Sequence, residues 1–341
     1  MKNFLHRFAV AITRGLAVIV AVMLVCGFFG ESVPFFDSLS HFRAHLTIVL
    51  FVAALVLIGL RSIISAILAA GIAAYAAVSV SAFVVPRPGA AKTALSQAKA
   101  PTSNQGSLKL LQMNLRFNAD TEPAIATIAR LDPDVVTLQE MNRDWVEAIE
   151  PLRAAYPYTA FCGVGDDVGG VAILSQFPFI AEGSICRAAD GFVARRLDVG
   201  QGRSLTVGSE HLEWPWPYRQ RSQIARLQPI LPDLAAPVVV AGDFNAAPWS
   251  GTLRLFAEAS GTRLVEGIGP TWLSNRLPRM LRPLVGLPID NILVSTGVDV
   301  VSVTREPATA SDHLPVMLRF DLRSSPPARS SPRVVDRAAG Q

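Results

Sequence analysis

The amino-acid sequence predicts an α/β domain preceded by an apolar helical region that crosses a membrane. Through the middle of the chain, short strand-like runs alternate with helical or loop segments, as in mixed α/β proteins. The apolar excess lies at the front of a 341-residue chain that is 50% hydrophobic and has a mean hydropathy of +0.36. The sequence therefore divides into a membrane region, residues 1–85, and a part that folds in water.

Three apolar segments predict about three transmembrane helices. Residues 15–30 and 46–60 are nearly free of charge, and residues 63–85 form a longer run that could cross a hydrocarbon core of about 30 Å. The two shorter runs need flanking residues to reach that length, such as residues 8–12 before the first one. One alternative is a cleaved signal peptide, against which the two further apolar segments argue. The other is two helices, with one short run lying in the membrane interface.

The basic residues beside the apolar segments set the expected orientation. In a three-helix arrangement they divide equally, with Lys2, Arg7, Arg14 and Arg61 on one side and Arg43, Arg87, Lys92 and Lys99 on the other. The N-terminal tail usually dominates, so the N-terminus is expected inside the cell. An odd number of spans then predicts a multi-pass protein of the inner cell membrane whose soluble domain is extracytoplasmic.

Composition separates the remainder of the chain into three segments. Residues 86–106 are rich in Pro, Ala, Ser and Lys, which is typical of a linker, and residues 323–341 have the Pro, Ser and Arg content of a disordered tail. The domain between them, residues 107–322, carries 19 basic and 24 acidic residues, although the whole chain has a net charge of +4. This balance argues against a non-specific nucleic-acid binder but does not exclude a local basic patch.

The expected strands of the domain are short apolar runs with many branched side chains, bounded by turn residues. In chain order, they are LKLLQMN, PDVVTLQEM, GGVAILS, SLTVGSEH, PVVVAGD, PIDNILVS and ASDHLPVMLRF. Two helices are expected between these strands. One follows a capping residue, Thr121, has Pro123 in its first turn and continues to Leu131, and the other covers residues 221–231.

Polar side chains recur where these apolar strands stop. They are Asn114, Glu140, His211, Asp243, Asn245, Asp290, Asp312 and His313. Asp243 and Asn245 are two residues apart, so in an extended chain they point to the same side. Taken alone, each such residue could be a turn or a cap, because Asp and Asn bond their own backbone. Together they predict carboxylates, amides and imidazoles collected at one edge of a sheet, where α/β proteins build active sites.

The order of these motifs resembles the endonuclease/exonuclease/phosphatase superfamily, which has the deoxyribonuclease-I-like fold. The resemblance covers roughly residues 108–322 and rests on QMN, LQEM, SEHL, GDFN, PIDNILVS and SDHLPV. It implies a two-sheet β-sandwich of mixed sheets flanked by helices, with the site at one end, and a hydrolase that acts on phosphoester bonds. Glu210 departs from the family pattern, because relatives usually have Thr before the first histidine.

The resemblance and the chemistry of the side chains imply a Mg²⁺ or Mn²⁺ cofactor. A hard cation prefers oxygen ligands from one or two carboxylates, together with water and substrate phosphate. Glu140 is the expected main ligand, with Asn114 and Asp312 completing or supporting the site. The cation would withdraw charge from a phosphoryl oxygen and stabilise the leaving group.

Catalytic roles fall on the other residues of the set. Asp243 is expected to orient and deprotonate the attacking water, and Asn245 to hold that water or the phosphoryl group. His313, kept in one tautomer by Asp290, would donate a hydrogen bond or a proton to the phosphate. His211 is the second imidazole that is expected to face the phosphate.

Two stretches beside these residues predict the substrate. EWPWPYRQR follows His211 and contains Trp214 and Trp216, and NRLPRMLRPLVGLP precedes Asp290 and contains Arg279. Trp and Tyr favour the headgroup zone of a bilayer, and Arg pairs with anionic headgroups. Each stretch alone could be an ordinary packed loop. Because both stretches lie next to predicted active-site residues, we expect the opening of the site to face the membrane surface. The expected substrate is then a lipid-linked phosphate or diphosphate, or a phospholipid.

Three further residues allow two interpretations each. Arg143, three residues after Glu140, could contact substrate or could begin a solvated helix. Cys162 and Cys186 both lie in the part expected outside the cytoplasm, where a disulfide can persist. They are therefore either a disulfide pair or two small buried side chains.

The sequence thus predicts a membrane-anchored, metal-dependent phosphoesterase that hydrolyses a phosphate ester or diphosphate on the extracytoplasmic side. Its expected partners are the lipid bilayer and a phosphorylated substrate. One alternative is an extracytoplasmic endo- or exonuclease that acts on nucleic acid. Another is a catalytically inactive binding domain, against which the presence of Glu140, Asp243, Asp290 and His313 argues.

Overall fold

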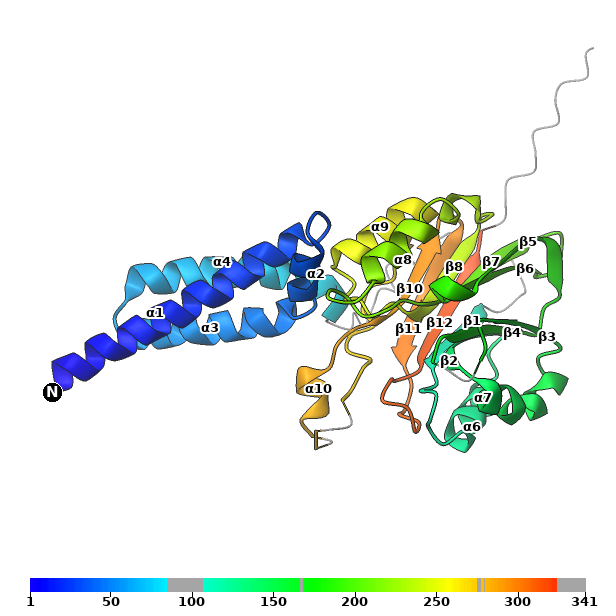
Figure 1. The fold of residues 1–341 in the computed structure, drawn as a ribbon, viewed down its shortest axis with the longest axis horizontal. Helices are drawn as coiled ribbons and strands as arrows, with labels where there is room; N and C mark the ends of the chain where they lie inside the picture. The colour runs from blue at the N-terminus through cyan, green and yellow to red at the C-terminus, as the bar shows by residue number, and fades with distance from the viewer. Residues whose placement is uncertain (85–106, 166–167, 275–276, 279, 324–341) are drawn as a thin grey trace, which may run out of the picture.

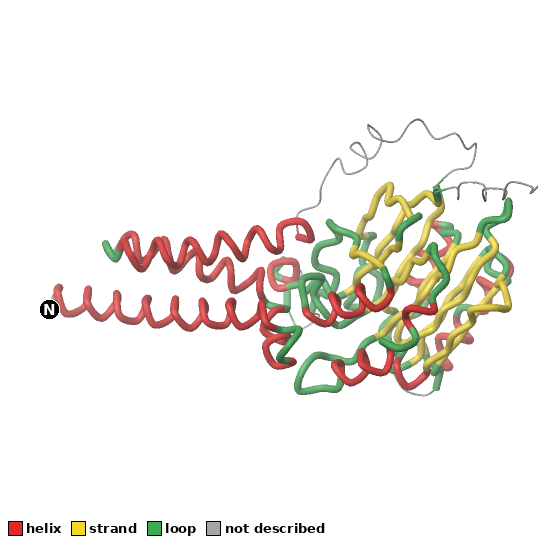
Figure 2. Tube along the Cα trace, turned by 90° about the horizontal axis from the view of Figure 1, so that it is seen from above, coloured by secondary structure: helices red, strands yellow, loops and turns green. Residues whose placement is uncertain are grey.

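The computed structural model shows an elongated molecule with a helical region at one end and an α/β domain at the other (Figures 1 and 2). The described residues are 1–84, 107–165, 168–274, 277–278 and 280–323. Three sequence predictions therefore lie outside the described residues: the linker at residues 86–106, the tail beyond residue 323, and the substrate contact of Arg279.

Within the described residues, the helical region consists of four helices. They are α1 (Lys2–Cys26), α2 (Pro34–Ser40), α3 (Arg43–Gly59) and α4 (Ile63–Val84). Helices α1, α3 and α4 pack side by side, and the short α2 lies at the end of this bundle next to the domain (Figure 1). Two helices, Asn3–Phe29 and Ile63–Val84, are long and apolar enough to cross a membrane. The number becomes three if α2 and α3, which are bent by 65° relative to each other, form one span.

The packing of the bundle suggests a lipid environment. Small side chains such as Ala54 and Ala73 fill much of the interface between α3 and α4, which lets the helices approach closely. Large apolar side chains point outward instead, and Ile48, Ile64 and Val78 are 63%, 79% and 74% exposed. Water-soluble bundles have the opposite distribution, because their large apolar side chains are buried.

The domain is a sandwich of two mixed β-sheets, each with six strands among the described residues. The strand order is β11-β12-β1-β2-β4-β3 in the first sheet and β5-β6-β7-β8-β10-β9 in the second. The first sheet contains β1 (Leu108–Asn114), β2 (Val135–Met141), β3 (Tyr158–Cys162), β4 (Gly170–Ser175), β11 (Val298–Arg305) and β12 (Val316–Leu322). The second contains β5 (Phe179–Arg187), β6 (Phe192–Asp198), β7 (Ser204–His211), β8 (Val238–Asp243), β9 (Thr262–Leu264) and β10 (Asp290–Ser295).

Helices cover the outer faces of both sheets, which confirms the predicted sandwich. Branched side chains from the two inner faces, such as Val171, Val207 and Ile292, form the core between the sheets. Helices α6 (Glu122–Leu131) and α7 (Arg143–Ala148) pack on the first sheet. Helices α8 (Gln220–Leu227) and α9 (Gly251–Ser260) pack on the second, and the short α10 (Arg282–Val285) lies apart from both sheets (Figure 1).

Parallel pairing brings the polar strand ends to one end of the sandwich. Strand β1 is parallel to β2, and β7 is parallel to β8. In the second pair, His211 lies directly opposite Asp243. Asp290, the first residue of the antiparallel strand β10, lies opposite Asp243 on its other side. Because parallel strands end at the same edge of a sheet, residues far apart in sequence meet there.

A disulfide joins the edge strands of the two sheets. It connects Cys162 at the end of β3 with Cys186 in β5, and the two Cα atoms are 5.6 Å apart. Of the two interpretations of these cysteines, the structure therefore has the disulfide. The third cysteine, Cys26, is free.

The helical region packs directly on the domain. The indole Nε1 of Trp249, in the loop between β8 and α9, donates a hydrogen bond to the Ser40 carbonyl at 2.7 Å. The same indole belongs to an apolar cluster with Val80 of α4. At the edge of this contact, Arg254 forms an ion pair with Glu31 at 3.0 Å. The two regions therefore share buried contacts in addition to their covalent connection.

Candidate active site

A cavity of about 500 Å³ opens at the end of the sandwich where the polar strand ends meet. Both sheets contribute to its wall. Its polar and aromatic lining includes Arg116, Glu140, His211, Trp214, Asp243, Asn245, Trp272, Asp312 and His313. Six of the eight predicted strand-end residues are in this set. The other two, Asn114 and Asp290, are buried directly behind them and form hydrogen bonds with them.

Glu140 lies at the end of β2 on the side of the first sheet. The pairing of β2 with β4 is irregular between Gln139 and Met141, and Glu140 has a left-handed backbone with φ +57°. Such a conformation is uncommon for a residue other than glycine and is often found at functional sites. The carboxylate accepts hydrogen bonds from Asn114 Nδ2 and from the backbone N–H of Phe117, both at 3.0 Å.

Asn114, at the end of β1, connects the two sides of the cavity. Its amide Nδ2 also donates to Asp243 Oδ2 at 2.9 Å, so the same amide group holds a carboxylate from each sheet. Its Oδ1 accepts the backbone N–H of Arg116 at 2.9 Å. In this geometry Asn114 supports Glu140 through a hydrogen bond, and its oxygen accepts one backbone N–H.

Asp243 uses its two oxygens for different purposes. Oδ1 accepts the backbone N–H of Asn245 at 2.9 Å, as an aspartate at a turn does. Oδ2 lies 3.7 Å from His313 Nε2 and 3.8 Å from His211 Nε2. The Asp243 side chain therefore stabilises a turn through one oxygen and faces two imidazoles in the cavity through the other.

Asn245 lines the cavity and has a buried side-chain oxygen without a partner in the described part of the chain. Its backbone is left-handed, with φ +45°, and its Nδ2 donates to the Leu212 carbonyl at 2.8 Å. Its Oδ1 is buried and has no hydrogen-bond partner among the described residues. A buried acceptor without a partner costs about 1–3 kcal/mol, so this oxygen is suited to accept a hydrogen bond from a bound water or substrate.

His313 and Asp290 form a buried pair. His313 Nδ1 lies 2.8 Å from Asp290 Oδ2, and the other oxygen of Asp290 accepts a hydrogen bond from Gln112 Nε2 at 2.8 Å. The backbone N–H of Asp290 donates to Thr271 Oγ1 at 3.1 Å. With Nδ1 occupied in this way, Nε2 is the nitrogen of His313 that faces Asp243.

Burial and neighbouring charges set the protonation of these groups. Burial alone would lower the pKa of His313, but the carboxylates of Asp290 and Asp243 outweigh it and raise the pKa to about 10. Burial raises the pKa of Asp243 to about 7, with His313 opposing this effect. Burial also lowers the pKa of His211. At neutral pH the cavity therefore contains one charged and one neutral imidazole, beside a carboxyl group that is present in both its protonated and its ionised form.

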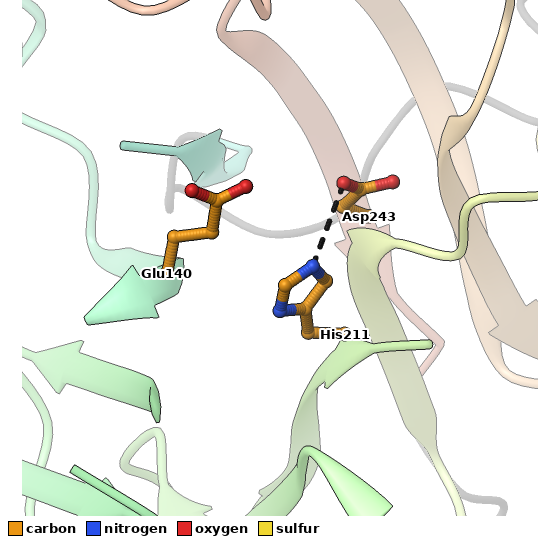
Figure 3. A group of neighbouring side chains, drawn as sticks. All are labelled: Glu140, His211 and Asp243. Atoms are coloured by element: carbon orange, nitrogen blue, oxygen red, sulfur yellow. Dashed lines mark ion pairs between the residues drawn. The ribbon is translucent and has the colours of Figure 1, made fainter. Parts of the chain in front are cut away.

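Two groups of side chains could hold a cation. Glu140, His211 and Asp243 offer ligand atoms that all lie within 4.8 Å of one another, and Figure 3 shows them facing a common space. Asp243, Asp290 and His313 form a second such group, but all three are buried. Carboxylate oxygens are the ligands that Mg²⁺ and Mn²⁺ prefer, so the half-buried Glu140 fits the predicted cofactor better than the buried group does.

The other predicted residues are spread around the cavity. Asp312 lines the wall, 4.0 Å from the Arg116 guanidinium, and accepts a hydrogen bond from Trp272 Nε1 at 3.2 Å. Trp214 also lines the wall. Two residues lie elsewhere. Arg143 begins helix α7 away from the cavity lining, and Trp216 packs edge-on against Phe35 of α2, with ring centroids 4.9 Å apart.

Sequence reasoning missed several residues of the site. Arg116 follows Asn114 by two positions, so its nearness to the motif could have indicated it. Trp272 packs edge-on against Trp214, with ring centroids 6.0 Å apart, and pairs with His313 through an isolated bridge. The sequence around Trp272 has no periodic pattern that distinguishes this residue from a core tryptophan.

Glu210, which departs from the family pattern, lies outside the site. It is adjacent to His211 on β7, and successive side chains of a strand point to opposite faces of the sheet. Glu210 is fully buried, and neither carboxyl oxygen has a hydrogen-bond partner among the described residues. Burial raises its pKa well above 4.5, so the carboxyl group is kept protonated.

Comparison with known proteins agrees with this geometry. Residues 111–313 match the Endonuclease/Exonuclease/phosphatase family, a span that runs from β1 to His313. The chain belongs to this family. Its members are hydrolases that act on phosphoester bonds. A comparison with curated proteins finds no match.

Solved structures share the fold of the endonuclease/exonuclease/phosphatase family with this chain. A family member from Beutenbergia cavernae is 21% identical, with a TM-score of 0.52 over 66% of this chain and 74% of that one. A member from Bacteroides vulgatus is 14% identical, with a TM-score of 0.54 over 64% and 100%. An AP endonuclease from Archaeoglobus fulgidus is 18% identical, with a TM-score of 0.51 over 63% and 100%. At these identities, the similarity establishes the fold and leaves the substrate open.

Proposed function

We propose that this protein is a membrane-anchored, metal-dependent phosphoesterase that hydrolyses a phosphate ester or diphosphate on the extracytoplasmic side of the inner membrane. One observation carries the proposal. Asp243, Asn245, His211 and His313 surround one side of a cavity, and Glu140 faces them from the other sheet. A base, an amide oxygen and two imidazoles opposite a metal-binding carboxylate are the groups that phosphoester hydrolysis requires.

Asp243 and Asn245 would handle the attacking water. The pKa of Asp243 is about 7, which suits a group that takes a proton near neutral pH. The unpartnered Oδ1 of Asn245 would accept a hydrogen bond from the same water. With one proton held in this way, the other proton of the water points toward Asp243, and its lone pair is free for the phosphorus atom.

The two imidazoles would bind the phosphoryl oxygens. His313 is a charged donor at neutral pH, and Asp290 keeps its Nδ1 occupied so that Nε2 can donate into the cavity. His211 is neutral and would donate a weaker hydrogen bond from the neighbouring strand. Charge that develops on phosphoryl oxygens is best stabilised by donors that are already in position, as both rings are.

Glu140 would be the main ligand of Mg²⁺ or Mn²⁺. Asn114 would support it through the hydrogen bond to its carboxylate, and Asp312 would supply a further oxygen from the cavity wall. When bound, the cation would withdraw charge from a phosphoryl oxygen and ease departure of the leaving group.

One feature supports the extracytoplasmic location and another supports the membrane anchor. The disulfide between Cys162 and Cys186 is of a type that persists in oxidising compartments and is rare in the cytosol. The apolar outer surface of the helical bundle suits an anchor in the inner membrane. An alkaline phosphatase reporter fused to the C-terminus, which is active only outside the cytoplasm, should be active. An inactive reporter, with an active cytoplasmic one at the same position, would contradict this orientation.

A lipid-linked phosphate or diphosphate is the favoured substrate. Helix α10 projects beside the end of the bundle next to the domain, which is where a membrane surface would lie (Figure 1). Met280 and Leu284 in this projection are 82% and 70% exposed. Exposed apolar side chains at that level suit contact with the headgroup zone. The segment leads back to Trp272 in the cavity wall, so the site lies close to the proposed membrane surface.

A nuclease is the second candidate function. Arg116 in the cavity wall could bind a nucleic-acid phosphate, and the fold is shared with the AP endonuclease from Archaeoglobus fulgidus. The acidic balance of residues 107–322 argues against it, because nucleic-acid binding favours a basic surface.

The test is a comparison of substrates with the full chain in lipid vesicles. Long-chain prenyl diphosphate, phosphatidic acid and single-stranded DNA are supplied with Mg²⁺, with chelator, and with the Asp243→Asn variant as the inactive control. We expect turnover of a lipid phosphate that chelator abolishes. Efficient cleavage of DNA without turnover of either lipid would favour the nuclease, and equal turnover in chelator would exclude the metal-dependent mechanism.

A further inference from the structure

Helix α2 of the helical region contacts the loop between β8 and α9. The carboxylate of Asp37, which is 3% exposed, accepts the N–H groups of Gly251 at 2.7 Å and Thr252 at 2.9 Å, and the Thr252 hydroxyl at 2.8 Å. Gly251 is the first residue of α9, so Asp37 caps this helix from a position 214 residues earlier in the chain. The cap adds to that of Ser250, the residue just before α9.

His41, directly after α2, contacts the same loop at a second point. Its side chain is buried, with Nδ1 2.7 Å from the Asp37 carbonyl oxygen and Nε2 3.1 Å from the Asn245 carbonyl oxygen. Both partners can only accept, so each contact is a hydrogen bond when the corresponding ring nitrogen carries a proton. The imidazole therefore links the helical region to the backbone of a residue in the cavity wall.

Asn245 has a left-handed backbone, which asparagine adopts more readily than most residues other than glycine, and hydrogen bonds to its N–H and to its carbonyl hold it in place. Its N–H donates to Asp243 Oδ1, and its carbonyl accepts from Gln220 Nε2 at 3.0 Å as well as from His41. The domain supplies two of these three contacts, and the helical region supplies the third. The side chain is itself held by the hydrogen bond from Nδ2 to the Leu212 carbonyl, so the unpartnered Oδ1 is attached to a residue that is fixed at both its backbone and its side chain.

We infer that His41 is a positioning residue of the active site, and that α2 makes the helical region a structural part of the phosphoesterase as well as its anchor. By fixing the Asn245 carbonyl, His41 keeps Asn245 Oδ1 where it can hold the attacking water. The inference rests on the role proposed above for Asn245. It implies that the domain separated from residues 1–84 would be impaired even on a substrate that needs no membrane.

The interface around His41 is close-packed, which fits a positioning role. A Cβ atom at Gly251 would lie 2.4 Å from the backbone nitrogen of Glu31, so the two regions approach too closely for any side chain there. The ion pair of Arg254 with Glu31 belongs to the same interface, but the two side chains are 51% and 38% exposed. This ion pair crosses the same interface but does not contact Asn245. Substitution of Arg254 is therefore a control for general weakening of the interface.

Two substitutions of His41 separate its two contacts. A glutamine places an amide nitrogen near the position of the histidine Nε2, so His41→Gln keeps a donor for the Asn245 carbonyl. An asparagine places its nitrogen near the position of Nδ1, so His41→Asn keeps only the contact with Asp37. The full chain in detergent is assayed with bis(4-nitrophenyl) phosphate, a soluble ester, so that delivery from the membrane does not enter the measurement.

We expect His41→Asn to lower kcat by about tenfold with little change in KM, because displacement of a catalytic group by a fraction of an ångström has effects of this order. His41→Gln and the control Arg254→Ala should keep kcat near that of the wild type. In the Asn245→Ala background, His41→Asn should have no further effect, since the group that it positions is gone. Equal kcat values for the wild type and His41→Asn, or losses that multiply in the double variant, would overturn the inference.

Failure of the proposed function would look different. If Asn245→Ala retained wild-type turnover, the role of Asn245 would be wrong and His41 would have nothing to position. A second measurement does not depend on turnover. Hydrogen exchange in residues 243–252 should be faster in His41→Asn than in His41→Gln or Arg254→Ala, and equal exchange in all three variants would overturn the inference.

Discussion

The carboxylates on the two sides of the cavity differ in solvent exposure. On the side of the first sheet, Glu140 and Asp312 are half-buried. On the side of the second sheet, His211 is also half-buried, but Asp243 and Asp290 are 1% exposed. His313, from the loop before β12, is 5% exposed and forms a continuous set of close contacts with these two carboxylates. Open carboxylate oxygens suit a cation that exchanges with solvent, whereas buried pairs suit protons held at fixed positions.

The difference shows how one cavity can combine metal binding and proton transfer. Asp312 and His313 are neighbours in sequence, yet Asp312 contacts Arg116 and Trp272, whereas His313 contacts Asp290 and Asp243. If the two sides act as proposed, a higher Mg²⁺ concentration should restore activity to a variant of a first-side residue. It should not restore activity to a variant of a second-side residue.

The largest effect is expected for Asp243→Asn on the second side. We expect kcat to fall by about 10³-fold, within the range that general base catalysis contributes, because the amide cannot take a proton from water. Raising the Mg²⁺ concentration should not restore the rate. Steady-state kinetics across a metal titration measures this, and calorimetric titration with Mn²⁺ checks that the cation still binds. Recovery at high metal concentration would place Asp243 on the metal side.

Glu140→Gln is the matching change on the first side. We expect the affinity for Mg²⁺ to fall by about 100-fold or more, since loss of even a group that supports a metal ligand from behind costs about 10–100-fold. Activity should therefore be low at limiting Mg²⁺ and should recover as the concentration rises. The comparison of the two sides fails if the variant is equally inactive at every metal concentration.

Asp290→Asn should have a smaller effect on turnover. The variant keeps the size of the side chain but removes the charge that holds His313, so we expect kcat to fall by about 100-fold, at the lower end of what acid–base groups contribute, with little change in KM. Asp290 does not line the cavity, so substrate binding should change little. A thermal melting curve controls for loss of folding. A rise in KM alone would indicate that Asp290 acts on binding and leaves the imidazole unaffected.

The smallest effect is expected at Glu210, which lies on neither side. Its folded-state pKa is raised above 4.5, so its contribution to stability is fully present at acidic pH and is lost as the pH rises toward the folded-state pKa. Replacement by Met removes the buried oxygens, and we expect the free energy of unfolding to rise by about 1–3 kcal/mol at neutral pH. The gain should shrink toward pH 4.5 in melting experiments. A gain that is independent of pH would show that the carboxyl group is not the cause.

The main features of the domain could be predicted because they depend on local pattern. Valine-rich runs predicted the strands, and polar residues at their ends predicted the set that includes Glu140, Asp243 and His313. The sandwich was implied by the resemblance to the endonuclease/exonuclease/phosphatase family that the order of the motifs indicates. The disulfide and the number of membrane spans could not be settled in this way. Helix α3 has only 17 residues, and whether it forms a span depends on the bend between it and α2.

The contacts of the site that were missed are tertiary contacts between distant segments. His41 lies 204 residues from Asn245, and no spacing in the sequence indicates that a polar residue between two apolar helices meets the GDFN loop. Asn114 shows a different limit. The sequence predicted that it completes or supports the metal site, but only the geometry shows that its amide nitrogen donates to two carboxylates, one from each sheet.

Because Asp37 caps α9, the domain cannot simply be combined with the helical region of another protein. A chimera that replaced residues 1–84 with a foreign anchor would leave the N–H groups of Gly251 and Thr252 without their acceptor. It would also leave the Trp249 indole without Ser40. Grafts that carry α2 along with the domain should therefore fold and work, whereas grafts made at the apparent domain boundary should not. The structural unit is therefore the domain together with helix α2 of the helical region.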